Sequence, residues 1–190
     1  DKKKLINLSL QNAKYMLLDK KKKKINRVER LENKHVLKKL QKDLRLKDLP
    51  INIECFDNSN LQGTDAVAAC VVFKNAKPSK KDYRHFNIKT VVGPDDFASM
   101  EEVVYRRYNR ILKEEKPLPN LIIIDGGKGQ LSAAVKSLEK LRLRGGVPVI
   151  GIAKRLEEIY FPNDSVPLYL DRRSESLKLI QRLRNEAHRF

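Results

Sequence analysis

Hydrophobic residues in the first quarter of the chain recur at steps of three and four. This stripe begins at Leu5 and continues to Leu44. Such spacing is typical of one face of an α-helix. The first proline or glycine is Pro50, so we predict a helical segment over residues 1–49. The charged run Lys20–Lys24 holds no apolar residue and indicates a solvated turn or break.

From residue 50 onward, the pattern changes to short runs rich in Val, Ile, Phe and Tyr, separated by turn residues. These runs predict a three-stranded antiparallel meander. Its strands are expected at 51–57, 66–73 and 83–92. Further strands are expected at 121–125 and 147–153, helices at 97–112, 130–141 and 174–190, and a small hairpin at 159–161 and 168–170.

The uninterrupted apolar runs 121–124 and 147–152 are typical of buried parallel strands. The predicted fold class is therefore α/β, with a mixed sheet of three antiparallel strands followed by parallel strands, flanked by helices. We expect two parts: a basic helical linker or extension at 1–49 and a domain at 50–190.

Charge is unevenly distributed along the chain. The net charge is +17, and residues 1–49 hold 17 Lys and Arg against 6 Asp and Glu. An excess of this kind attracts polyanions such as nucleic acid, although a general use of Lys on solvent faces explains it equally well. Cys55 and Cys70 form no metal-binding or disulfide pattern. With no membrane-length apolar run, we expect a cytoplasmic protein without a membrane partner. Asp1 is not an initiator residue, so we expect a piece of a longer protein.

Three residues fall where chemistry tends to sit. Asp57 ends the first predicted strand, Asp125 ends the fourth, and His188 lies on the last helix. If the two strands are neighbours, the carboxylates converge and need a cation such as Mg²⁺ or Mn²⁺. Two such ions suit phosphodiester hydrolysis, and the histidine could add a ligand or move a proton. The plainer alternatives are turn or capping aspartates and a surface histidine.

A glycine-rich turn, Gly126–Gln130, joins the fourth strand to the next helix. Its amides could bind a phosphate, with Lys128 adding charge, although tight packing explains the glycines as well. The turn is not a P-loop, because Gly and Gln follow the lysine. Lys154 and Arg155 follow the fifth strand and are candidates for contact with the DNA backbone, with surface solvation as the alternative.

Two adjacent aspartates, Asp95 and Asp96, precede the predicted helix 97–112. Asp96 is the expected N-cap, with Ser99 as the rival. Capping and the helix dipole account for both acids. The alternative is that one of them supplies a further carboxylate to a metal site.

Six segments occur in an order that resembles the UvrC family of bacterial excision-repair proteins. They are Glu54-Cys-Phe-Asp57-Asn-Ser-Asn60 with Gln62-Gly63, Phe86-Asn-Ile-Lys89, Asp95-Asp96-Phe-Ala-Ser-Met100, Ile124-Asp125-Gly-Gly-Lys-Gly-Gln130, Val149-Ile-Gly-Ile-Ala-Lys154-Arg155 and Glu186-Ala-His-Arg-Phe190. The resemblance is to the C-terminal, 5′-incision endonuclease half and runs from about residue 50 to the end. Residues 1–49 resemble the preceding helical stretch less specifically.

The resemblance implies a ribonuclease-H-like fold and a cut on the 5′ side of a lesion in damaged double-stranded DNA. It implies an Asp57, Asp125 and His188 metal site, with Asp95 or Asp96 involved in the same activity. It also implies the partners UvrB and the UvrA-loaded repair complex. Asn58 departs from the family, which usually has Ile there. The Gly-Ile-Tyr nuclease module and the tandem helix-hairpin-helix domain of the family are absent from this stretch of sequence.

Two other functions stay open. One is a ribonuclease-H-like nuclease of another specificity, such as junction resolution or cleavage of RNA–DNA hybrids, because fold and carboxylates do not separate these activities. The other is a non-catalytic nucleic-acid-binding or partner-docking module. That module would bind DNA in a salt-sensitive way that does not depend on Asp125.

Overall fold

The computed structural model describes residues 2–61, 65–91, 95–153 and 157–190. The chain divides into two compact units, one ending at His35 and one running from Val36 to Phe190. Helix α1 (Lys2–Asp43) makes up the first unit and begins the second. In the described part of the chain, no helix combines the length and the apolarity needed to span a membrane.

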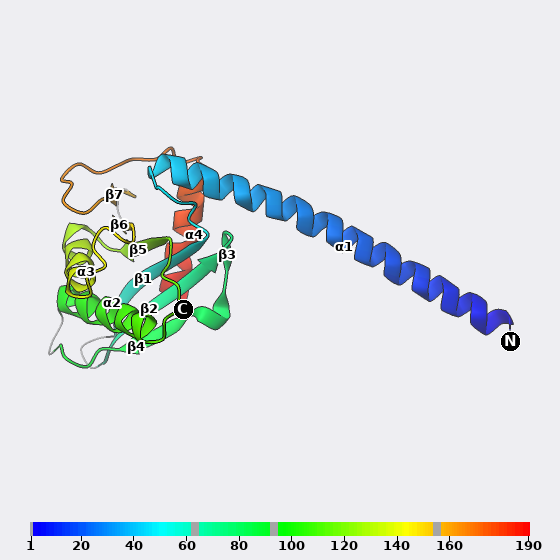
Figure 1. Cartoon of the computed structure of the whole chain (residues 1–190), viewed down its shortest axis with the longest axis horizontal. Helices are drawn as coiled ribbons and strands as arrows, with labels where there is room; N and C mark the ends of the chain where they lie inside the picture. The colour runs from blue at the N-terminus through cyan, green and yellow to red at the C-terminus, as the bar shows by residue number, and fades with distance from the viewer. Residues whose placement is uncertain (1, 62–64, 92–94, 154–156) are drawn as a thin grey trace. The chain divides into compact units, whose positions relative to one another are not determined.

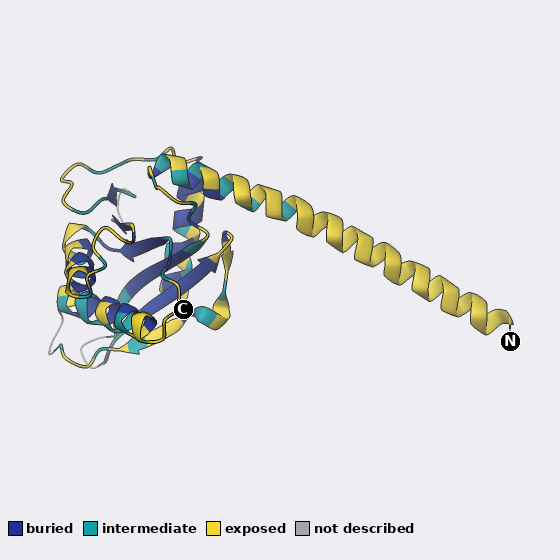
Figure 2. Ribbon diagram, in the orientation of Figure 1, coloured by how far each residue is buried: buried dark blue, intermediate teal, exposed yellow. Residues whose placement is uncertain are grey.

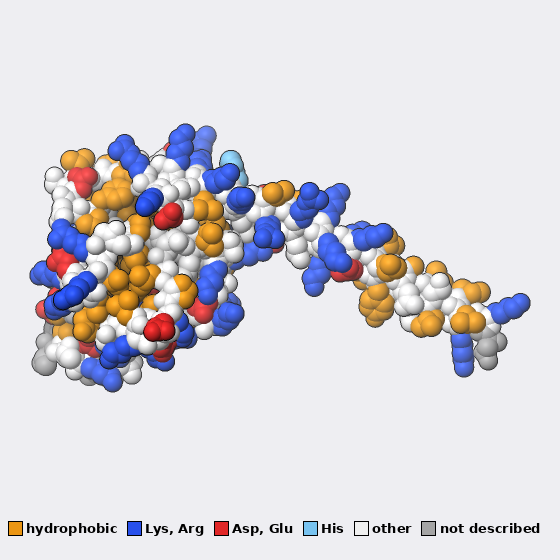
Figure 3. All heavy atoms as spheres, in the orientation of Figure 1, with side chains coloured by type: hydrophobic (Ala, Val, Ile, Leu, Met, Phe, Trp, Pro, Cys, Tyr) orange, Lys and Arg blue, Asp and Glu red, His pale blue; other side chains and the backbone are white. Residues whose placement is uncertain are grey.

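The first unit is helical, as predicted, but the expected break at Lys20–Lys24 is wrong. Helix α1 continues through this run, where Lys23 forms an ion pair with Asp19 one turn earlier at 2.7 Å. Lysine is a good helix former, and such pairs add a little stability, so a run of lysines need not interrupt a helix. The hydrophobic stripe of this unit is exposed (Figure 2), and Lys and Arg side chains are spread along it (Figure 3).

The described part of the second unit holds one mixed sheet, which confirms the predicted fold class. Its strands run in the order β3-β2-β1-β5-β6-β7, and β4 pairs with β2. Their bounds are β1 Asn52–Leu61, β2 Asp65–Lys74, β3 Lys77–Pro78, β4 Arg84–Asn87, β5 Leu121–Asp125, β6 Val149–Ile152 and β7 Ile159–Tyr160. The pairs β1–β2 and β2–β4 are antiparallel, whereas β1–β5 and β5–β6 are parallel.

Some predicted bounds differ from the structure. Strand β4 is much shorter than 83–92, and a 3-10 turn, η1 (Lys80–Asp82), precedes it. The predicted hairpin is reduced to one antiparallel bridge between Ile159 and Leu168, and β7 pairs with β6 along its other edge. Strand β1 is longer than predicted and continues through the polar residues Asn58–Asn60, because β2 supplies a hydrogen-bonding partner along its whole length.

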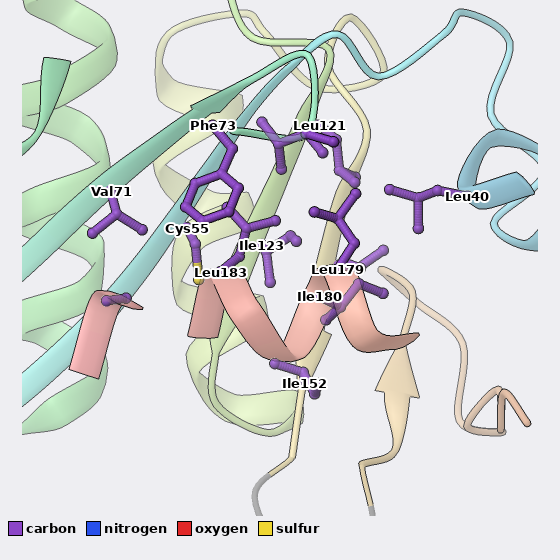
Figure 4. Packing of buried hydrophobic residues seen from close by; sticks show 14 of the residues in the cluster. Leu40, Cys55, Val71, Phe73, Leu121, Ile123, Ile152, Leu179, Ile180 and Leu183 are labelled. Atoms are coloured by element: carbon purple, nitrogen blue, oxygen red, sulfur yellow. The ribbon is translucent and has the colours of Figure 1, made fainter. Parts of the chain in front are cut away.

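Helices cover both faces of the sheet (Figure 1). Helix α4 (Glu175–Arg189) packs on one face, over a core that includes Cys55, Ile123 and Leu183 (Figure 4). Helices α2 (Asp96–Lys113) and α3 (Lys128–Lys140) cover the other face, over the core that includes Phe56 and Ile124. Because side chains alternate along a strand, this layering decides which helix each strand residue faces.

Candidate active site

Asp57 and Asp125 occupy matching positions on neighbouring parallel strands. The β1–β5 register ends at the pair Phe56 and Ile124, so each aspartate is the next residue along. Cys55 and Ile123, two positions earlier, pack in the core under α4, so the alternation of side chains turns both aspartates toward α4 as well. Both are buried, with 3% of Asp57 and 2% of Asp125 exposed. The structure thus brings the two predicted carboxylates to one place.

The reason for this placement differs from the prediction for Asp57. The residue does not end its strand, since β1 runs on to Leu61. Strand β5, however, ends at Asp125. Asp57 therefore lies where β1 loses its parallel neighbour and continues with β2 alone.

His188, on α4, approaches Asp57 from the face that both aspartates share. Its Nδ1 atom lies 3.2 Å from Oδ2 of Asp57, and 72% of the His188 side chain is exposed. Helix α4 begins at the N-cap Ser174, whose hydroxyl accepts a hydrogen bond from the Leu177 amide. Its buried face then holds the helix on the sheet. One nitrogen of the imidazole therefore meets a buried carboxylate, while most of the ring stays in solvent.

An aromatic cluster fixes the end of α4 and thereby the position of His188. The Phe190 ring stacks on His85 with centroids 3.8 Å apart and meets Tyr83 edge-on at 5.1 Å. The Tyr83 hydroxyl donates to Glu186 at 3.1 Å. Sequence reasoning assigned no role to these residues, because their partners lie about a hundred positions away in the chain. The only signal was that Glu186 and Phe190 belong to the motif around His188.

The turn after Asp125 is held tightly against β6. The Gly126 amide donates to the Ile152 carbonyl at 3.0 Å. A Cβ atom added to Gly151 would lie 2.9 Å from the Gly126 carbonyl oxygen, so β6 can approach the turn only without a side chain there. These contacts fix the backbone that carries Asp125.

Lys128 is the first residue of α3, and its ammonium is already engaged. It donates to the Ser165 carbonyl at 2.8 Å and lies 5.0 Å from the centroid of the Tyr160 ring. The ammonium has three N–H donors, so the hydrogen bond to the Ser165 carbonyl leaves others for a phosphate. The other candidate DNA contacts, Lys154 and Arg155, lie outside the described residues.

Asp95 and Asp96 lie at the start of α2, next to the strand of Asp57. Asp95, and not Asp96, is the N-cap, because the helix begins one residue earlier than predicted. The Asp95 carboxylate accepts from the Phe97 and Ala98 amides at 3.0 and 2.9 Å. Asp96 is exposed in the first turn, and its carbonyl accepts a 2.9 Å hydrogen bond from the Asn58 side chain. The Asn58 side chain therefore ties the start of α2 to the strand that carries Asp57.

Asp57 and Asp125, which we call the acid pair, make the electrostatic potential around them negative. Burial raises the pKa of the Cys55 thiol well above its usual value, and the charges of Asp125 and Asp57 raise it further. Among the described side chains, no three of His, Cys, Asp and Glu lie close enough together to hold a metal ion. Of the predicted site residues, the structure thus brings Asp57 together with His188 and with Asp125. The Asp95 carboxylate instead caps α2.

A sheet of this order, with two aspartates side by side on its central parallel strands, is that of a ribonuclease-H-like domain. The family model described as the UvrC RNase H endonuclease domain matches residues 41–190. The chain belongs to this family of endonuclease domains, which confirms the resemblance found in the sequence motifs.

Relatives named UvrABC system protein C match the whole chain. Identity is 65% over 191 residues with the protein of Flavobacterium psychrophilum and 66% over 191 residues with that of Christiangramia forsetii. It is 50% over 196 residues with the protein of Bacteroides fragilis. In each case the chain covers 32% of the relative, so it spans about a third of the curated relatives' length.

Similarity to solved structures is more remote. A Ciona intestinalis endonuclease V, solved in complex with a DNA containing an inosine, is 20% identical with a TM-score of 0.43. The match covers 78% of this chain and 65% of that one. A Kluyveromyces polysporus Argonaute with a guide RNA gives a TM-score of 0.38 at 16% identity, over 76% of this chain and 18% of that one.

Proposed function

We propose that this chain is the part of a DNA excision-repair nuclease that cuts the damaged strand on the 5′ side of a lesion, with the help of Mg²⁺ or Mn²⁺. The observation that carries the proposal is the buried pair Asp57 and Asp125, in matching positions on adjacent strands and approached by His188. Membership of the UvrC endonuclease family supports the substrate and the reaction.

The acid pair fits a divalent cation. Two buried carboxylates side by side repel each other, and a cation with oxygen ligands relieves the repulsion. Asp57 and Asp125 would hold the ion, and His188 and the exposed Asp96 would have to move closer to the two aspartates to become further ligands. A divalent ion bound there supplies charge stabilisation and an activated water for phosphodiester hydrolysis.

The side chain of His188 is suited to proton transfer. When its Nδ1 carries a proton, it donates to the Asp57 carboxylate, and that contact sets the orientation of the ring. The other nitrogen, Nε2, then accepts or returns a proton on the exposed side. Helix α4 and the Phe190 cluster hold the ring at this distance.

The partners follow from the relatives' name, which describes one component of a UvrABC system. We infer that the damaged duplex is presented by UvrB after loading by UvrA, in the cytoplasm. Lys128, Lys154 and Arg155 are the proposed contacts to the DNA backbone, and their charge is of the sign that a phosphate backbone attracts.

The first experiment is a calorimetric titration of Mn²⁺ into the wild-type chain and into Asp125→Ala. The matched control is Asp19→Ala, which removes an exposed carboxylate on α1. We expect the wild type and the control to bind Mn²⁺ and Asp125→Ala to lose binding. Equal binding by all three proteins, or none at millimolar metal, would contradict the proposed site. A cleavage assay comes second, because it also depends on partner proteins.

A further inference from the structure

Phe97 is an exposed aromatic ring close to the turn that follows Asp125. Of the six phenylalanines, all of which are described, it is the only one classed as exposed, with 56% of its surface accessible. It follows Asp95 and Asp96 in the first turn of α2. Much of its surface can therefore contact a bound molecule.

The ring packs against the turn that follows Asp125. A Cβ atom added to Gly129 would lie 2.4 and 2.7 Å from two carbon atoms of the Phe97 ring, so the ring lies directly on the glycine. Gly129 is in the first turn of α3, four residues beyond Asp125. A residue with a side chain there would displace the ring.

The backbone beneath Phe97 is also fixed. Asp95 caps the helix through the Phe97 amide, and Asn58 holds the Asp96 carbonyl. Asn58 directly follows Asp57. The ring is thus held between the strand of one aspartate and the turn of the other, with much of its surface open to solvent.

We propose that Phe97 is a stacking platform for an unpaired base of the DNA strand bound at the acid pair. An exposed ring held in one orientation offers a π-face, and a nucleobase is the part of a nucleic acid that stacks on such a face. A phosphate would instead be repelled by the neighbouring carboxylates of Asp95 and Asp96. This role rests on the proposed function, because the ring would contact the same DNA strand that is cut at Asp57 and Asp125.

The test is the binding of single-stranded oligonucleotides that carry 2-aminopurine, whose fluorescence is quenched by stacking. Binding is measured in EDTA to prevent cleavage, on the wild-type chain, Phe97→Leu and Phe97→Trp. Leucine keeps the packing on Gly129 but has no π-face, and tryptophan keeps the π-face. We expect Phe97→Leu to lose quenching and to bind about ten-fold more weakly, since stacking is worth roughly 1–3 kcal/mol per base. Phe97→Trp should bind at least as tightly as the wild type.

Two further variants sharpen the result. Leu112→Ala removes another exposed hydrophobic side chain from the opposite end of α2 and should leave binding and quenching unchanged. Gly129→Ala keeps Phe97 but displaces its ring, and should reduce quenching. Quenching by Phe97→Leu equal to that of the wild type, or no quenching by the wild type, would overturn the proposal.

The Mn²⁺ titration separates this failure from failure of the proposed function. Phe97 carries no metal-binding atom, so Phe97→Leu should take up Mn²⁺ as the wild type does. Normal Mn²⁺ binding without base stacking would remove only the platform. Loss of the Asp125-dependent Mn²⁺ binding in the wild type would remove the site itself.

Discussion

The imidazole of His188 lies 3.2 Å from the carboxylate of Asp57, although 131 residues separate them in the chain. Asp57 is buried in the sheet and His188 is largely exposed at the end of α4. A carboxylate at this distance orients an imidazole and favours a proton on the nitrogen that faces it. The contact thus joins the buried Asp57 carboxylate to an exposed imidazole that can exchange protons with solvent.

Replacing His188 should therefore affect the reaction far more than the fold. For His188→Gln we expect a change of less than about 1 kcal/mol in the free energy of unfolding, because the side chain is exposed. Strand cleavage in Mn²⁺ should fall by about 10²- to 10⁴-fold, the usual contribution of a positioned acid or base. The matched control is His35→Gln on α1, which should cleave like the wild type. Equal cleavage rates for His188→Gln and the control would exclude a chemical role for this histidine.

The acid pair should destabilise the chain when no cation is bound. Asp125→Asn removes one of two buried like charges, so its melting temperature in EDTA should exceed that of the wild type. In Mn²⁺ the order should reverse, because only the wild type gains binding energy, about 2.7 kcal/mol at a hundred times the Kd. Asp57→Asn should gain less in EDTA, since it also weakens the contact with His188, which then faces a neutral amide in place of a carboxylate. An Asp125→Asn protein that melts below the wild type in EDTA would count against charge repulsion at this site.

Much of the site could be predicted from sequence, because apolar runs locate strands and the residues that end them. The pairing of Asp57 with Asp125 followed from placing each next to such a run. The end of β1 was wrong, because Asn58–Asn60 is polar and gains its strand conformation from pairing with β2. The N-cap was misplaced by one residue, since Asp95 and Asp96 are chemically equivalent candidates and only backbone geometry distinguishes them.

Long-range contacts were beyond the reach of the sequence. Nothing in the pattern indicates that Asn58 reaches the Asp96 carbonyl, or that Phe97 packs on Gly129. Both contacts depend on how α2 crosses the sheet, which side-chain periodicity does not specify. The fold class was more accessible, because the alternation of helices with apolar strands already limits the topology.

A buried ion pair on the α2 face of the sheet should matter for stability but not for metal binding. Glu54 accepts from the Arg107 guanidinium at 2.6 and 3.2 Å and from the Tyr108 hydroxyl at 2.9 Å. Removing the carboxylate leaves a largely buried guanidinium without its counter-charge, so Glu54→Leu should cost about 3–5 kcal/mol of unfolding free energy. The double variant Glu54→Leu with Arg107→Met should recover most of that loss in urea denaturation. Loss of Mn²⁺ binding in the folded double variant would show that Glu54 belongs to the site after all.

Glu102 should make the stability of the chain depend on pH in the acid range. It accepts from the Lys89 amide, from the amide and hydroxyl of Thr90, and from Arg106. Burial alone would raise the pKa of this carboxyl, but these hydrogen bonds hold it below its usual value of 4.5. A carboxyl with a lowered folded-state pKa stabilises the fold above its unfolded value, and that contribution is lost as pH falls through the folded value.

The midpoint of urea unfolding should therefore fall more steeply for the wild type than for Glu102→Gln over about one to two pH units below 4.5. Glutamine can still accept a hydrogen bond but has no charge to lose. Exposed acids such as Glu114 also have a lowered pKa, because of their ion pairs with Lys116 and Arg110. Salt at about 1 M screens those surface pairs, but it should leave the hydrogen bonds from Thr90 and Lys89 to Glu102 largely intact. A difference between wild type and Glu102→Gln that disappears in salt would attribute the pH dependence to the surface pairs and not to Glu102.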